Sequence, residues 1–311
     1  MAARIDFAKR GDVLLELGTD EETKVVVSVY SVVLGLASPV FEAMFNGNFA
    51  EGQTLSTTSP RAVPLPEDDQ ESMILICKIA HLQTAELPQQ LSVDQLAVFA
   101  TTCDKYQCGA AVQAWSQVWI AKLLSEEPAA NFEQVVFATY VLDMPLEFYK
   151  ACTILTRTEV EDTKIFALDY LPSSIFDALR SNRRRGEMQL YQSFHGVTQY
   201  LGTCKASRGV LSSFFVKLKK IGAWPVTPTS IESFKDNIAK LMEEIPQQAC
   251  SGNVLTCGCV DNGPIKAAFV SELEGVCNRI KGICLDCIKR EALGDMRECR
   301  ISHNSEGMLI G

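Results

Sequence analysis

Apolar residues in the first third of the chain follow two different spacings. The stretches 12–17 (DVLLEL) and 23–30 (TKVVVSVY) are runs of aliphatic and β-branched residues, with the polar GTDEE between them. Such runs on either side of a short polar segment predict a β-hairpin. Residues 61–65 (RAVPL) predict a further strand. Pro64 places that strand at a sheet edge, because proline has no N–H to donate to a ladder.

In segment 31–45 the apolar residues recur every three or four positions, which predicts a helix. The residues that share this face are Val33, Leu36 or Ala37, Val40, Phe41 and Met44. Ser38 and Pro39 divide the segment, because serine caps a helix start and proline is tolerated at the first helical position. We therefore expect two short helices, the second beginning at Pro39.

The stretches 66–82, 91–106 and 107–124 predict three further helices. In the second of them, Ser92 and Gln95 stand at the spacing of a capping box. The residues expected to face inward in the third are Ala111, Trp115 and Val118.

The rest of the chain has helical spacing and no strand pattern. Residues 132–181 are expected to be helical, SNRRRGE at 181–187 to be a charged break, and 230–245 to be a helix. Another helix is expected from Pro264, with Gly282 as its C-terminal cap. The fold class is therefore α+β, with the sheet confined to the N-terminal part. The expected domains are 9–124, a helical region at 131–181 and a helical, Cys-rich region at 187–311.

Charge and composition exclude several function classes. The net charge is −9, so nucleic acid is not the expected partner, because phosphate contacts need clustered Lys and Arg. There is no apolar run long enough to span a membrane and no signal peptide, so we expect a cytoplasmic or nuclear protein. The chain lacks common catalytic motifs and has three histidines, which favours a non-enzymatic protein. His81 is expected to be a cation at the end of its helix.

The chain has twelve cysteines. In a reducing compartment they are not expected to form disulfides. The cysteines expected to be small core residues are Cys77, Cys103, Cys108, Cys152, Cys204 and Cys277.

The C-terminal cysteines have the spacing of a metal site. Cys284 and Cys287 form a Cys-x-x-Cys pair, and Cys299 and His303 form a Cys-x-x-x-His pair. Together they make one set of four zinc ligands, and four protein ligands imply a structural Zn²⁺ rather than a catalytic one. Cys257 or Cys259 could replace a member of the second pair. Reduced, half-buried thiols or a redox pair are the alternatives.

The N-terminal elements resemble a BTB/POZ domain. The resemblance is carried by GDVLLEL, VYSVVLGLASPVFEAMFNGNFAEG, VPLPEDD and FATTCDKYQC, within residues 9–124. SPVFEAMF followed by a Cys-rich tail is similar to BTB proteins of filamentous fungi. The resemblance implies a small sheet flanked by helical hairpins, and a function in protein–protein interaction.

The resemblance also indicates partner-binding residues. Phe49-x-Glu51 matches the hydrophobic-x-Glu pattern through which some BTB domains contact a cullin scaffold. Alternatively, Phe49 covers the core and Glu51 is solvated. Tyr30 replaces a histidine of many animal members, and Asp12 keeps the usual Asp-Val start. The long N-terminal strand of many dimeric members has no convincing counterpart in MAARIDFAK, so self-association is left open.

Two hypotheses follow. In the first, the chain is a non-enzymatic interaction protein, and one version makes it a substrate adaptor for a cullin-type ubiquitin ligase. In the second, it is a transcription or chromatin regulator with a C-terminal zinc-binding module. The acidic net charge weighs against this second hypothesis. An enzyme in the C-terminal half has no sequence feature to support it.

Overall fold

The computed structural model describes residues 3–20, 23–47, 49–158, 171–200, 273–294 and 298–304, with single positions at 216, 217, 219, 220, 231, 236, 237, 240, 271 and 309. Of residues 191, 194–200, 292 and 293 only the backbone is described. The chain divides into two compact units, Met1–Phe148 and Tyr149–Gly311.

A four-stranded mixed sheet with the order β1-β3-β2-β4 lies in the N-terminal unit. Its strands are β1 (Ala3–Asp6), β2 (Val13–Leu17), β3 (Val25–Val29) and β4 (Arg61–Leu65). β2 and β3 form the antiparallel hairpin expected from the sequence, with Leu15 opposite Val27. β4 pairs in parallel with β2 at one edge, which confirms the position expected from Pro64. β1 was not expected; it pairs in parallel with β3 at the other edge, where its polar sequence ARID is largely exposed.

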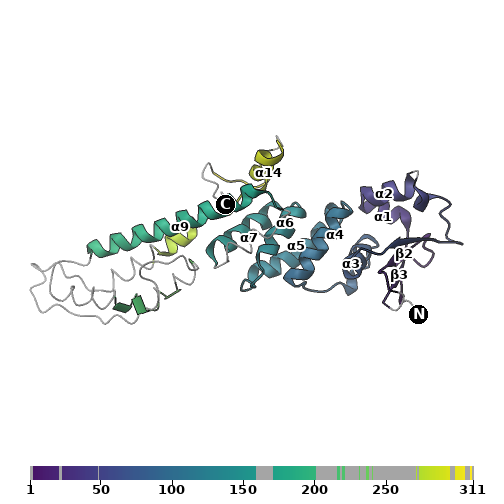
Figure 1. Ribbon diagram of the computed structural model, residues 1–311, viewed down its shortest axis with the longest axis horizontal. Coiled ribbons are helices and arrows are strands. Elements are labelled where there is room, and N and C mark those ends of the chain that lie inside the picture. The colour runs from purple at the N-terminus through teal and green to yellow at the C-terminus, as the bar shows by residue number, and fades with distance from the viewer. Residues whose placement is uncertain are drawn as a thin grey trace, which may run out of the picture. The chain divides into compact units, whose positions relative to one another are not determined.

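Helices make up the rest of this unit. They are α1 (Ser31–Ala37), α2 (Pro39–Asn46), α3 (Gln70–Ala80), α4 (Val93–Lys105), α5 (Gly109–Ser125) and α6 (Glu133–Val141), with short 3-10 turns at Ala50–Gly52 and Thr84–Glu86. α1 and α2 lie side by side next to the strands (Figure 1). The expected break is confirmed: α2 begins at Pro39, and the Ser38 hydroxyl accepts the Phe41 N–H at 3.1 Å. The Ser92–Gln95 capping box is also present.

The inward face of α5 is not the one expected. Ala111 and Val118 are exposed and Trp115 is half-buried. The buried residues are Val112, Ser116, Trp119, Ile120 and Leu123. Because α5 is apolar around much of its circumference, spacing alone did not identify the face. Packing against α4 decides it: the rings of Phe99 and Trp119 meet edge-on, with centroids 5.4 Å apart.

Two distant segments that carry the sequence resemblance meet at Tyr106. The Ser38 hydroxyl donates to the Tyr106 carbonyl at 2.5 Å, and the Phe41 ring stacks on the Tyr106 ring with centroids 4.3 Å apart. The Tyr106 hydroxyl donates to Asp68 at 2.7 Å, and Lys105 pairs with the same carboxylate at 2.6 Å. SPVF and DKY therefore belong to one network, buried at Ser38, Phe41, Tyr106 and Asp68, that joins α2 to the end of α4.

His81, directly after α3, is a neutral hydrogen-bonding residue rather than the expected cation. Its Nε2 accepts the Tyr30 backbone N–H at 3.1 Å, so its Nδ1 carries the proton and donates to the Cys77 carbonyl at 2.9 Å. Burial lowers the pKa of His81, and outweighs the hydrogen bond to Cys77, which raises it. The position of His81 at a helix end does not make it a cation, because both nitrogens of the neutral ring already form hydrogen bonds.

We expect this unit to lose stability as the pH falls below about 6.5. The unfolded imidazole of His81 then takes up a proton that the folded one resists, so the free energy of unfolding decreases. Urea unfolding of the full chain, followed by tryptophan fluorescence between pH 8 and pH 5, measures this. His81→Gln can donate and accept at similar positions without titrating, and should reduce the pH slope. If stability depends on pH as steeply in His81→Gln as in the unmodified protein, folded His81 is not the group that resists protonation.

The described residues of the C-terminal unit are mainly helical. Its helices include α7 (Pro145–Arg157), which begins just before it, α9 (Ser173–Tyr200) and α14 (Leu285–Leu293); residues 273–279 are also helical. The charged break expected at 181–187 is wrong, because these residues lie inside α9 (Figure 1). Arginine and glutamate are good helix formers. Arg183 also donates to the carbonyls of Leu155 and Thr158, at 2.9 and 3.2 Å, near the end of α7.

The segment before α14 is only partly as expected. Residues 273–279 are helical, and Leu273, Val276 and Ile280 are buried. Gly282 is not a left-handed cap; its backbone lies so close to the Tyr149 carbonyl that a side chain would collide with it. The end of this helix is instead satisfied by Arg157, which donates to the Cys277 carbonyl at 2.7 Å. Almost all of the helix expected at 230–245 lies outside the described residues.

Candidate metal centre and binding groove

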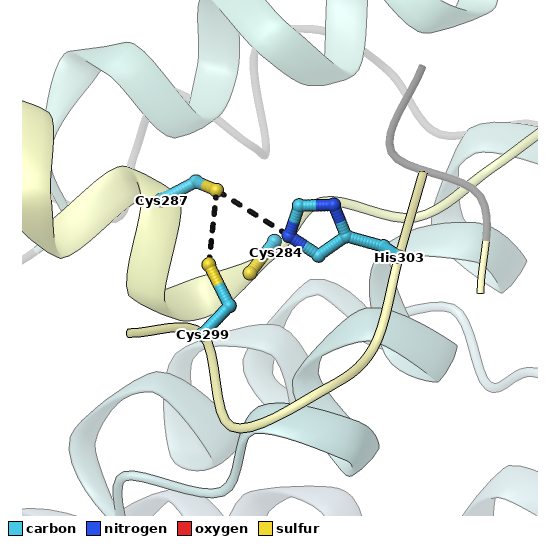
Figure 2. Close-up of side chains that lie close together, drawn as sticks. All are labelled: Cys284, Cys287, Cys299 and His303. Atoms are coloured by element: carbon cyan, nitrogen blue, oxygen red, sulfur yellow. Dashed lines mark hydrogen bonds between the residues drawn. The ribbon is translucent and has the colours of Figure 1, made fainter. Parts of the chain in front are cut away.

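Three cysteines and one histidine of the C-terminal unit point toward one another (Figure 2). The ligand atoms of Cys284, Cys287, Cys299 and His303 all lie within 4.8 Å of one another. This is the set of four expected from the sequence. The alternates Cys257 and Cys259 lie outside the described residues.

Two short segments supply these side chains. Cys284 is the N-cap of α14 and Cys287 lies in its first turn. At this spacing one turn of helix brings both sulfurs to the same side. α14 ends at Gly294, whose φ of 67° is in the left-handed region that glycine adopts without strain. Cys299 and His303 lie on the chain that follows.

The distances match those between the ligands of one metal ion. The Cys287 sulfur is 3.5 Å from the Cys299 sulfur and 3.5 Å from His303 Nε2. With Zn–S bonds of about 2.3 Å, two sulfurs on a tetrahedron are roughly 3.8 Å apart. A disulfide needs about 2.05 Å. The sulfurs are therefore separated as in a metal site and not bonded to each other.

The orientation of His303 also suits a metal ligand. Its Nδ1 lies 3.0 Å from the Asn304 carbonyl oxygen. The carbonyl can only accept, so Nδ1 carries a proton. In the neutral imidazole the lone pair is then on Nε2, which faces the three sulfurs. A ligating histidine commonly has its tautomer fixed by such a hydrogen bond.

The thiols strongly affect one another's ionisation. Burial raises the pKa of Cys284, and burial together with its cysteine neighbours raises the pKa of Cys287 to about 12. At Cys299 burial also acts to raise the pKa. Interactions with His303, the other two cysteines and Arg290 outweigh burial and lower the pKa of Cys299 to about 7. Thiolates this close repel one another, and a bound cation removes that repulsion.

One side of the cluster is apolar. Cys284 packs with Tyr149 and Ile301 in a small buried group, and Cys287 and Cys299 contact it. A centre with four protein ligands and an apolar side has no open position for substrate. The four residues are therefore placed to hold a metal ion in a closed site.

Sequence reasoning missed three residues around this centre. The Arg290 guanidinium donates to the Cys299 sulfur at 3.5 Å. Asp286 and Arg300 form an ion pair at 2.7 Å beside the ligands. A weak signal existed, since Asp286 stands between two ligand cysteines and Arg300 directly follows another. That signal does not predict the ion pair between Asp286 and Arg300, because the pair depends on how the segment that holds Arg300 packs against α14.

The remaining cysteines behave as core residues where the structure describes them. All eight described cysteines are free. The buried ones outside the cluster are Cys77, Cys103, Cys108, Cys152 and Cys277, as expected. Cys204 lies outside the described residues.

A second candidate site is a groove in the N-terminal unit that includes Phe49 and Glu51. The groove has a volume of about 370 Å³ and is lined by Pro39, Val40, Ala43, Met44, Phe49, Glu51 and Gln107. Phe49 is 59% exposed, so it does not cover the core, and Glu51 is half-buried. The structure thus brings these two residues together with the apolar face of α2.

Tyr30 and Asp12 do not line this groove. The Asp12 carboxylate accepts the Ser31 backbone N–H at 2.8 Å and the Ser31 hydroxyl at 2.6 Å. It therefore satisfies a free N–H at the start of α1. The Tyr30 ring stacks on His81 with centroids 6.3 Å apart. Both side chains have structural roles inside the unit.

Comparison with known proteins adds no family. No protein-family model matches this chain, and no curated protein matches its sequence. Among the described residues, no helix is both long and apolar enough to cross a membrane.

Proposed function

We propose that this chain is a non-enzymatic interaction protein whose N-terminal unit is a BTB/POZ-like domain that binds a cullin scaffold. In this role it would act as a substrate adaptor for a cullin-type ubiquitin ligase in the cytoplasm or nucleus. The observation that carries the proposal is the groove in which Phe49 and Glu51 lie together.

The groove has the chemistry of a protein-binding surface. An exposed phenylalanine beside the apolar face of α2 offers a large area that a partner can bury. The half-buried Glu51 adds one charged acceptor, which fixes the orientation of the partner. The element order supports the same proposal, because a hairpin, two short helices, an edge strand and helical pairs are what the resemblance implies.

We further propose that the Cys₃His cluster binds a structural Zn²⁺. Thiolate and imidazole ligands favour zinc over calcium or magnesium, which prefer oxygen. The ion would hold residues 298–303 against the start of α14. A zinc module also favours the second candidate, a transcription or chromatin regulator. The net charge of −9 weighs against the regulator, because phosphate contacts need clustered Lys and Arg.

Binding of the purified full chain to the N-terminal region of a cullin scaffold tests the proposal. We expect Phe49→Ala and Glu51→Ala each to weaken binding about tenfold or more, because interface residues of this kind carry much of the binding energy. Calorimetry or surface plasmon resonance gives the dissociation constants. Leu36→Ala and Glu67→Ala are matched controls, since both residues are exposed and neither lines the groove.

The possible outcomes separate the candidates. Equal affinities of all four variants would place the contact elsewhere and remove the groove from the proposal. No binding by the unmodified chain would sink the adaptor function. Salt-dependent DNA binding by the full chain would favour the regulator instead.

A further inference from the structure

The two segments that carry the metal ligands are also joined by a link that needs no metal. Asp286 stands in α14 between Cys284 and Cys287, and Arg300 directly follows Cys299. The Asp286 carboxylate accepts three hydrogen bonds from Arg300: the backbone N–H at 2.7 Å, Nε at 3.0 Å and Nη2 at 2.7 Å.

The geometry of this pair makes it stronger than an ordinary surface ion pair. The Asp286 side chain is only 9% exposed. Both carboxylate oxygens are used: Oδ1 accepts Nε and Nη2 of the guanidinium, and Oδ2 accepts the backbone N–H. Hydrogen bonds between ionised groups are stronger than those between neutral groups. The bond to the Arg300 backbone N–H fixes the chain next to Cys299, so it sets where that sulfur points.

We propose that Asp286 is a positioning residue of the metal centre, and that with Arg300 it holds the Cys299–His303 segment against α14 so that the four ligands face one another before the ion binds. This inference rests on the metal site proposed above. A segment that is already docked loses less chain freedom on binding than one that must be captured from solution. The pair therefore raises metal affinity without touching the ion.

Arg290 has a different role and does not replace this pair. It reaches the Cys299 sulfur itself at 3.5 Å, and so acts on the charge of a ligand. Glu291 lies on the same helix as Asp286 but is exposed. Replacing Glu291 by glutamine changes the charge of α14 as much as the same change at Asp286, which makes it a matched control.

The test measures metal affinity in the full chain. Zn²⁺ affinity is determined by competition with a chromophoric chelator for the unmodified protein, Asp286→Asn, Arg300→Lys and Glu291→Gln. We expect Asp286→Asn to lower the affinity about 10- to 100-fold, as for other residues that orient metal ligands. Arg300→Lys keeps the positive charge but loses the guanidinium hydrogen bonds to Asp286. Its Zn²⁺ affinity should therefore lie between those of the unmodified protein and Asp286→Asn. Glu291→Gln should match the unmodified protein.

Co²⁺ absorption distinguishes positioning from ligation. At saturating Co²⁺, Asp286→Asn should still give the bands of a tetrahedral thiolate site, because no ligand has been removed. Equal Zn²⁺ affinity in Asp286→Asn, with or without a lower melting temperature, would overturn the inference and leave the metal site intact. If Asp286→Asn does not fold, equal affinity in Arg300→Lys overturns it instead. An unmodified chain that binds neither metal would sink the metal site itself.

Discussion

Removing the metal is expected to unfold the Cys-rich end of the C-terminal unit. The purified chain should contain one zinc, and Cys287→Ser should lose it. Cys287 is the most informative ligand to replace, because its sulfur makes the 3.5 Å contacts to both Cys299 and His303. Structural zinc contributes an apparent binding free energy of about 10–16 kcal/mol in zinc-finger peptides, and this is also folding free energy.

Mass spectrometry of the native protein measures the zinc content, and thermal unfolding with and without a chelator measures the stability. Cys277→Ala is the control, since this thiol is buried in the same unit but lies outside the cluster. It should keep its zinc and its sensitivity to chelator. An unmodified protein without metal, whose melting temperature is the same with chelator, would contradict the metal centre.

Phe41→Ala is expected to destabilise the N-terminal unit by about 3–5 kcal/mol, the cost of removing a fully buried phenylalanine. The Phe41 ring stacks on Tyr106 and on Phe45, with centroids 4.3 and 5.8 Å apart. Its loss leaves a cavity where SPVF meets DKY. Tyr106 then loses the ring that stacks on it.

Urea unfolding of the full chain, followed by tryptophan fluorescence, gives this value from the shift in the unfolding midpoint of the N-terminal unit, which holds Trp115 and Trp119. Leu36→Ala, which removes an 86% exposed side chain from the neighbouring helix, should change stability by no more than about 0.5 kcal/mol. A loss below about 1 kcal/mol in Phe41→Ala would mean that the site closes over the cavity.

Some features were predictable from sequence because they depend on neighbours within a few residues. The β2–β3 hairpin, the division at Ser38 and the capping box at Ser92 are of this kind. The approach of Cys284 to Cys287 was also predictable, since Cys-x-x-Cys at a helix start needs only one turn to bring its sulfurs together. The sequence left Cys257 and Cys259 open as alternatives in the second pair. The charges of α9 misled the prediction because they favoured a break, although the same residues are good helix formers.

Other features were decided by contacts between distant segments. Local spacing was enough to predict where most N-terminal elements begin and which side chains are candidates for a metal site. Three features depend on packing between distant segments: the buried face of α5, the neutral state of His81, and the need for glycine at position 282 beside Tyr149. Tertiary packing also decided the pairing of Asp286 with Arg300 and the groove beside Phe49. The physical reason is that local spacing fixes backbone conformation and capping, whereas burial, ionisation and close approach depend on the segment that packs opposite.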